Sequence, residues 1–410
     1  MMRVCFKPWA LLVAALAALS IQTAPTLAAN VDCRTSGSFE AWLARFKQQA
    51  AAQGISSNAI AAASPFLVYD QRIVNIDRGQ RIFSQTFLEF SDKMLAGGRV
   101  SSGQNVIRKN AAAFAREEKE YGIPPAVITG FWGLESDFGA NMGNYQAIKS
   151  LVSLAYDCRR AEMFRGHLFD SLRLIERGDL QASEMIGSWA GELGQTQMMP
   201  SEYFKYAVDY DGDGRRNLLH SAADVIGSTA NYLISLGWKR GEPWLQEVHV
   251  PTDLPWDQAD LTIQLPRSKW ASLGVTLPDG KPLPADQLKA SLLLPMGRFG
   301  PSFLAYDNFQ VYLKWNNSLV YSTTAAYYAT RLAGAPAMIH RGTGAIPPVT
   351  FEETRELQQL LIKQGFDVGG ADGKLGTSTR TAIRAMQIKL GLPADSYPTP
   401  ELLQRMRGLR

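Results

Sequence analysis

Residues 124–139 constrain the fold more than any other stretch of this 410-residue chain, because they read PPAVITGFWGLESDFG. Pro124 and Pro125 are tolerated in the first turn of a helix, so a helix is expected to start here. The residues that follow are apolar on nearly every face, which predicts that the helix is buried. It ends on a carboxylate, Glu135, which would lose much of its hydration in such a place.

Loss of hydration penalises a charged carboxylate and raises its pKa. A carboxylic acid that stays protonated near neutral pH can donate a proton to a leaving-group oxygen. The helix context alone favours a plainer alternative, in which Glu135 only caps the helix or pairs with a cation. Asp137 follows two residues later, about 200° around a helix, so the two acids do not face one site if the helix continues.

The net charge of the chain is too small to indicate nucleic acid as a partner. The formal charge is +4, and it falls to +2 without the first 28 residues, which hold Arg3 and Lys7 and no acid. We find no basic run and no stripe of alternating aromatic and basic residues.

The first 28 residues have the pattern of a signal peptide. Arg3 and Lys7 precede a mostly apolar stretch that is too short for a comfortable transmembrane helix, and small residues at Thr26 and Ala28 predict cleavage after Ala28. An uncleaved membrane anchor is the alternative. Cleavage would leave a periplasmic protein that does not span the membrane.

The three cysteines exclude two kinds of site. Cys5 precedes the apolar stretch and Cys33 lies too far beyond it, so no lipoprotein signal is present, and no Cys/His spacing suits a metal. Only Cys33 and Cys158 remain after cleavage. In an exported protein they form either one disulfide or two free buried thiols, and the sequence does not separate these alternatives.

The pattern of residue types changes twice along the chain. Apolar residues at helical spacing predict helices through residues 38–120 and in AEMFRGHLFDSLRLIERG, SAADVIGSTANYLISLGW and LVYSTTAAYYATRLAG. Between about 241 and 313 prolines become frequent, and the short runs LQEVHV, LTIQL and SLLLP are expected to be strands. A Gly- and Pro-rich segment at residues 338–350 predicts a linker.

Residues 351–410 are expected to form a small unit of three helices. FEETRELQQLLIKQG places Leu357, Leu360 and Leu361 on one side, TSTRTAIRAMQIKLG places Ile383, Met386 and Leu390 inward, and TPELLQRM is a short third helix. About 60 residues is marginal for independent folding but sufficient.

Longer motifs carry a resemblance that the single residues do not. GFWGLESDFG, SWAGELGQTQMMPSEYFKYAVDYDGDGRRNL and YDNFQVYLKWNNSLVY, in this order, closely resemble the soluble lytic transglycosylase B family of peptidoglycan-cleaving enzymes, over residues 38–334. The C-terminal unit looks like a peptidoglycan-binding domain. The resemblance implies a mainly α protein, with a lysozyme-like α+β catalytic domain at 29–337, the linker at 338–350 and a three-helix peptidoglycan-binding domain at 351–410.

In this family one glutamate performs both proton transfers, and the matching position is Glu135. It would protonate the oxygen between N-acetylmuramic acid and N-acetylglucosamine, then act as base toward the muramoyl C6 hydroxyl. The hydroxyl attacks C1, so no water is consumed and a 1,6-anhydro sugar forms. This fits the absence of an obvious second acid, whereas most glycoside hydrolases need two.

The resemblance also implies substrate-binding residues in the cleft. They are Ser136, Ser188, Gln197, Tyr232, Trp315, Asn316, Ser318 and Tyr321. Where Trp315 stands the family commonly has tyrosine, so the resemblance does not predict a hydroxyl contact at this position, although ring stacking on a sugar is still expected. For the aromatic residues, core packing is the alternative.

An acidic loop at residues 209–220 matches part of an EF-hand. Asp209, Asp211 and Asp213 stand at positions 1, 3 and 5, and Arg215 at position 7 would bind through its backbone carbonyl. Position 12 is histidine instead of glutamate, and Asp224 is the candidate for the last ligand, as some relatives use a later aspartate. The loop either binds a structural Ca²⁺ or is an acidic turn without an ion. No cofactor is expected to be needed for the chemistry.

Two other functions remain open at this point. A hydrolytic muramidase would cleave the same bond with water, and a non-catalytic scaffold would only bind the cell wall. In each case the expected partners are peptidoglycan glycan strands, with other cell-wall enzymes as further candidates and no nucleic acid.

Overall fold

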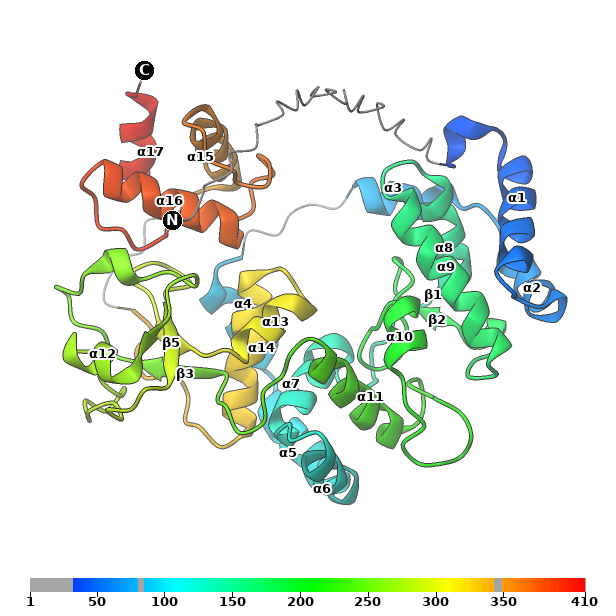
Figure 1. Cartoon of the computed structure of the whole chain (residues 1–410), viewed down its shortest axis with the longest axis horizontal. Helices are drawn as coiled ribbons and strands as arrows, with labels where there is room; N and C mark the ends of the chain where they lie inside the picture. The colour runs from blue at the N-terminus through cyan, green and yellow to red at the C-terminus, as the bar shows by residue number, and fades with distance from the viewer. Residues whose placement is uncertain (1–31, 80–84, 343–348, 410) are drawn as a thin grey trace, which may run out of the picture. The chain divides into compact units, whose positions relative to one another are not determined.

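The computed structural model describes residues 32–79, 85–342 and 349–409. The signal peptide predicted for residues 1–28 lies outside these ranges, as does part of the predicted linker. The fold is built mainly from helices with a few short strands, which confirms the predicted fold class (Figure 1). No helix within these ranges is long and apolar enough to cross a bilayer.

The N-terminal helices follow the apolar spacing of the sequence. Ser38 starts the first of them by accepting a hydrogen bond from the backbone amide of Ala41, and Trp42 and Phe46 on its inner face are buried. The predicted helical character is confirmed for residues 38–79 and 85–120. The elements are η1 (Arg34–Ser36), α1 (Phe39–Ala52), α2 (Ser57–Ala63), η2 (Ser64–Phe66), α3 (Gln71–Arg78), α4 (Phe87–Leu95), α5 (Arg99–Lys109) and α6 (Ala111–Glu120).

Helix α7 (Pro125–Ser136) is the buried helix that the prolines and the apolar run predicted. Ten of its twelve residues are buried, and helices α5, α11 (Ala222–Ser235) and α14 (Leu319–Leu332) pack against it (Figure 1). At Gly133 a Cβ atom would lie 2.9 Å from ring atoms of Phe138 and Tyr328, so only glycine permits this close packing. The helix ends because Asp137 and Phe138 adopt left-handed backbone angles.

The segment after α7 is also largely helical. Strands β1 (Tyr145–Gln146) and β2 (Ile186–Gly187) pair antiparallel on either side of two long helices. Cys33 and Cys158 form a disulfide that joins residues 125 positions apart, so the first of the two cysteine alternatives holds. The remaining elements are α8 (Ala147–Tyr156), α9 (Ala161–Glu176), η3 (Ala182–Glu184) and α10 (Pro200–Tyr206).

A four-stranded antiparallel sheet of order β3-β6-β5-β4 occupies the Pro-rich region. LQEVHV and SLLLP contribute strands as predicted, whereas LTIQL is a turn apart from its last residue. Asp260 holds this turn by accepting hydrogen bonds from the amide and hydroxyl of Thr262. The elements are β3 (Leu245–Val248), η4 (Trp256–Gln258), β4 (Leu265–Pro266), α12 (Arg267–Ser272), β5 (Lys289–Leu293), β6 (Ser302–Ala305) and α13 (Phe309–Trp315).

The C-terminal unit is the predicted set of three helices. Leu357 and Leu361 of α15 (Phe351–Lys363) pack with Ile383 and Met386 of α16 (Thr377–Lys389) and with α17 (Pro400–Arg407), so this unit has a core of its own.

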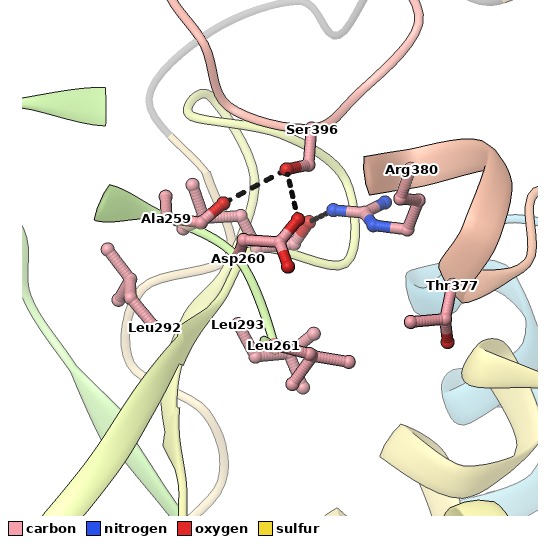
Figure 2. Close-up of a pocket in the computed structure, with 9 residues that line it drawn as sticks. Ala259, Asp260, Leu261, Leu292, Leu293, Thr377, Arg380 and Ser396 are labelled. Atoms are coloured by element: carbon pink, nitrogen blue, oxygen red, sulfur yellow. Dashed lines mark hydrogen bonds between the residues drawn. The ribbon is translucent and has the colours of Figure 1, made fainter. Parts of the chain in front are cut away.

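The C-terminal unit also contacts the strand region directly. The buried guanidinium of Arg380 donates hydrogen bonds to the carbonyls of Leu294 and Pro295. The hydroxyl of Ser396 donates to the carbonyl of Ala259 and lies 3.1 Å from the carboxylate of Asp260 (Figure 2). Because these buried polar groups find hydrogen-bond partners across the contact, the contact is specific.

Candidate active site

Glu135 lies in the last turn of α7 and is enclosed on one side by the corner between α13 and α14. Its Oε1 accepts a hydrogen bond of 2.8 Å from the indole N–H of Trp315 and one of 2.5 Å from the hydroxyl of Tyr321. Its Oε2 has no hydrogen-bond donor among the described residues, and the side chain is partly exposed. The carboxyl group therefore presents one free oxygen to the surroundings.

The electrostatics match this enclosure. Burial raises the pKa of Glu135 to about 7, the hydrogen bonds from Tyr321 and Trp315 oppose that rise, and the nearby charge of Glu192 adds to it. Burial also raises the pKa of Tyr321 well above its ordinary value, so its hydroxyl stays a hydrogen-bond donor. At neutral pH Glu135 is poised to give up or take up a proton, as a general acid–base group requires.

Trp315 contacts the acid itself through its indole N–H, which donates a hydrogen bond to Glu135. Its predicted contact with substrate stays a prediction. The ring centre lies 4.3 Å from that of Phe131 and 5.2 Å from that of Tyr232, and Tyr232 in turn lies 4.9 Å from Tyr206. The rings of Trp315, Tyr232 and Tyr206 are partly exposed and form an apolar surface next to the acid, suited to the flat face of a sugar, whereas Phe131 is fully buried.

Asn316 and Ser318 build the corner that presents Trp315 and Tyr321. The side-chain oxygen of Asn316 accepts from the amide of Ser318, and the hydroxyl of Ser318 caps α14 by accepting from the amide of Tyr321. Their side chains are thus engaged within the protein, and the structure gives them a positioning role in addition to the substrate contact predicted for them.

Ser136 differs from its prediction. Its side chain is buried at 2% exposure, donates to the carbonyl of Gln195 and accepts from the amide of Gly139. Both capacities of the hydroxyl are used inside the protein, because the left-handed turn after α7 folds back over it. Ser136 therefore fixes the end of the acid-bearing helix and is not placed to contact a substrate.

Ser188 and Gln197 lie in the loop between β2 and α10, as the resemblance implied. The hydroxyl of Ser188 accepts hydrogen bonds from the amides of Ala190 and Glu192. Gln197 has a left-handed φ of 49°, and its amide nitrogen donates to the carbonyls of Gly194 and Met142. Strained backbone of this kind at a non-glycine residue is concentrated at functional sites.

Sequence reasoning missed Gln195, which ties this loop to the acid-bearing helix. Its side-chain oxygen accepts a hydrogen bond from the indole N–H of Trp132 on α7, and its side-chain nitrogen donates one to the carbonyl of Leu219. Each of these hydrogen bonds is 2.9 Å long. Tyr206 and Glu192 were missed as well. A buried glutamine in a loop of small residues was the available signal, but its partners lie far away along the chain.

The acidic loop brings three of its predicted ligands together. Oxygen atoms of Asp209, Asp211 and Asp213 lie within 4.8 Å of one another. Arg215 adjoins them, while its side chain points to the carbonyl of Asp179. Asp224 is not in this group, because its buried carboxylate accepts hydrogen bonds from backbone amides of residues 210, 211 and 217.

Comparisons with known proteins agree with this geometry. Residues 38–330 match the transglycosylase SLT domain, and residues 351–406 match the putative peptidoglycan-binding domain. Membrane-bound lytic murein transglycosylase B of Escherichia coli (strain K12) is 31% identical over 237 residues, which are 58% of this chain and 64% of that protein. The chain thus spans less than two thirds of that relative's length.

Two solved structures extend the comparison. SltB3 from Pseudomonas aeruginosa, crystallised with NAG-anhNAM-pentapeptide, is 40% identical with a TM-score of 0.83, over 90% of this chain and 99% of that one. Escherichia coli Slt35, crystallised with calcium, is 29% identical with a TM-score of 0.55, over 64% of this chain and 83% of that one. By the match over residues 38–330, the chain belongs to the transglycosylase SLT family, with a C-terminal peptidoglycan-binding domain.

Proposed function

We propose that this chain is a lytic transglycosylase, which cleaves the β-1,4 bond between N-acetylmuramic acid and N-acetylglucosamine in peptidoglycan and leaves 1,6-anhydro ends. The observation that carries the proposal is the carboxyl group of Glu135, with a pKa raised to about 7, two donors on Oε1 and a free Oε2. The relatives named above, one of them crystallised with an anhydro-muramoyl fragment, support the assignment.

The geometry of Glu135 fits both proton transfers. Trp315 and Tyr321 occupy Oε1, so the proton of the neutral acid resides on Oε2. That proton passes to the glycosidic oxygen as its bond to C1 breaks. The resulting carboxylate, stabilised by the same two donors, then accepts the proton of the muramoyl C6 hydroxyl while O6 bonds to C1. The acid is regenerated and no water is consumed.

The product distinguishes this reaction from its rivals. Purified protein should solubilise isolated sacculi, and mass spectrometry should find anhydro ends. A hydrolytic muramidase would give reducing ends heavier by one water, and a binding scaffold would release nothing. Glu135→Gln removes the proton donor but keeps the shape, so it should abolish release while sedimentation with sacculi persists. Cleavage by this variant would exclude Glu135 as the acid.

The C-terminal domain is proposed to bind peptidoglycan and so to keep the enzyme on the cell wall. The chain is proposed to act in the periplasm after cleavage of residues 1–28. N-terminal sequencing of the mature protein from a periplasmic extract would test the cleavage site. Other cell-wall enzymes remain predicted partners, to be sought by co-purification with the inactive Glu135→Gln variant.

The acidic loop is proposed to bind a structural Ca²⁺ through Asp209, Asp211 and Asp213. Three carboxylates whose oxygens lie within 4.8 Å fit a hard cation, and the structure of Slt35 with calcium supports the idea. The ion would neutralise the three like charges and brace the loop after α10. Calcium should raise the thermal midpoint of the protein and of Asp253→Asn, an exposed control, but not that of Asp211→Asn. No shift at millimolar calcium would refute the site.

A further inference from the structure

Phe131 is a fully buried residue that contacts the aromatic hydrogen-bond donor of the active site. It lies on α7 four residues before Glu135, so both side chains are on the same face of that helix. Its ring centre is 4.3 Å from that of Trp315, and the two ring planes are inclined by 30°. Trp315 therefore contacts α7 at two points one turn apart, through its ring at Phe131 and through its indole N–H at Glu135.

A second ring of α13 holds Phe131 in place. The ring of Tyr312, three residues before Trp315, stacks on Phe131 with the ring centres 4.8 Å apart and the planes inclined by 23°. Tyr312 is fully buried, and its hydroxyl has no hydrogen-bond partner among the described residues, so its contribution here is its ring. Because protein interiors are close-packed, Phe131 cannot shift without displacing these two neighbouring rings of α13.

The hydrogen bond from Trp315 depends on the orientation of its ring. An indole carries a single N–H donor on one edge, and a hydrogen bond weakens steeply when that N–H points away from the acceptor. The aromatic neighbours of Trp315 among the described residues are Phe131 and Tyr232. Tyr232 is partly exposed and lies farther away, at 5.2 Å with the planes inclined by 48°. The buried ring of Phe131 is therefore the firmer of the two restraints.

We propose that Phe131 is a positioning residue that acts through Trp315: its ring holds the indole at the angle at which the N–H points to Oε1 of Glu135. The inference rests on the proposed function, since it concerns the same acid. An indole that turned away would leave Oε1 with one donor instead of two, and the carboxylate formed by proton transfer would be less stabilised. The phenylalanine of GFWGLESDFG thus has a role beyond filling the core.

Phe131→Leu tests this role, because leucine keeps an apolar side chain in the core and removes the ring on which the indole rests. The hydrogen bond from Trp315 lowers the pKa of Glu135, so its loss should raise that pKa. The alkaline limb of the pH profile of kcat/KM on soluble muropeptides should move up by about 0.5 pH unit, and kcat should fall about 3- to 5-fold. An unmoved limb overturns the proposal.

A double substitution separates this role from a direct effect of Phe131 on Glu135. If Phe131 acts through the indole N–H, Phe131→Leu should move the limb no further in a protein that already carries Trp315→Phe. An equal shift in both backgrounds would overturn the proposal, because the ring would then act on the acid without Trp315.

Phe46→Leu is the matched control for the loss of packing. Phe46 is also a buried phenylalanine between rings, 5.7 Å from Trp42 and 4.7 Å from Phe169, but its partners lie on α1 and α9 instead of at the active site. It should lower the thermal midpoint as Phe131→Leu does and leave the limb in place. A limb that moves equally in this control would show that the shift reports general destabilisation, which contradicts the proposal.

A further measurement needs no activity. Nitrogen-15 NMR of the tryptophan indoles, with the signal of Trp315 identified by its loss in Trp315→Phe, reads the hydrogen bond directly. Exchange of this N–H with solvent should be about 10-fold faster in Phe131→Leu, or in Phe131→Met if the leucine variant does not fold, and unchanged in Phe46→Leu. If the unchanged protein cleaves no peptidoglycan, the proposed function fails, whereas unchanged exchange in the Phe131 variant of an active enzyme defeats only the role of Phe131.

Discussion

The indole nitrogen of Trp315 donates a hydrogen bond of 2.8 Å to Oε1 of Glu135, across 180 residues of sequence. The two side chains come from different helices, α13 and α7, and meet where both helices end. The bond favours the charged form of the carboxyl group and so opposes the effect of burial on its pKa. The acidity of Glu135 is therefore set by a balance that a single substitution can shift.

Trp315→Phe should raise the pKa of Glu135, because it removes one of the two donors and keeps an aromatic ring. We expect the alkaline limb of kcat/KM to move up by about one pH unit and kcat to fall about 10-fold, since the carboxylate formed by proton transfer loses a stabilising donor. Trp244→Phe is the control, because its indole donates to the carbonyl of Ala326 instead. A limb that stays in place would show that the indole N–H does not tune the acid.

Gln195→Met should destabilise the protein by about 2–4 kcal/mol. The substitution leaves the indole of Trp132 and the carbonyl of Leu219 buried without their partner. Thermal unfolding measures the loss. Gln264→Met, at a surface amide that donates to Asp307, should change stability by less than about 0.5 kcal/mol. Equal effects of the two substitutions would contradict the role of Gln195 as a tie between loop and helix.

Glu117→Gln should stabilise the protein, and more so at alkaline pH. Burial raises the pKa of Glu117 from 4.5 to about 8, so the unfolded chain loses this proton at lower pH than the folded protein does. Stability therefore falls as pH rises from about 5 to 8, by about 3 kcal/mol at pH 7 if this group acts alone. Urea unfolding at pH 5 and pH 8 should show a larger gain for the variant at pH 8. Equal gains would refute the assignment.

Much of the site could be predicted from the sequence because its motifs are local. The proline start, the apolar run and Glu135 all lie within one helix, so their pattern is visible along the chain. Tyr321 and Trp315 came from a resemblance over many motifs, and the structure places both on the acid.

The remainder of the site depends on contacts between distant segments. Gln195 is defined by its partners, the indole of Trp132 on α7 and the carbonyl of Leu219, so it has no local signal in the sequence. Ser136 was expected to bind substrate, but its hydroxyl is used at the end of α7, where it accepts from the amide of Gly139. Ser318 caps α14, a role that adds to the substrate contact predicted for it. The capping rule was the signal that would have identified Ser318.

Arg380→Ala should uncouple the C-terminal domain from the strand region. It leaves the carbonyls of Leu294 and Pro295 buried without a donor, a loss of about 2–4 kcal/mol. Calorimetry should then resolve a separate, lower transition for helices α15–α17. Arg355→Ala, at an exposed position of α15, should leave a single transition. One unchanged transition in both variants would show that the contact of Arg380 does not couple the two parts.

The disulfide between Cys33 and Cys158 links the stability of this fold to the compartment that holds it. In the chain-entropy model, closing a loop of this length stabilises a protein by about 5 kcal/mol. Cytoplasmic thiol reductants prevent that bond from persisting. A molecule that stays in the cytoplasm, and so lacks this disulfide, is therefore less stable than an otherwise identical molecule that has been exported. If the enzyme acts in the periplasm, as proposed, it reaches its full folding stability only after export, in the compartment that contains its peptidoglycan substrate.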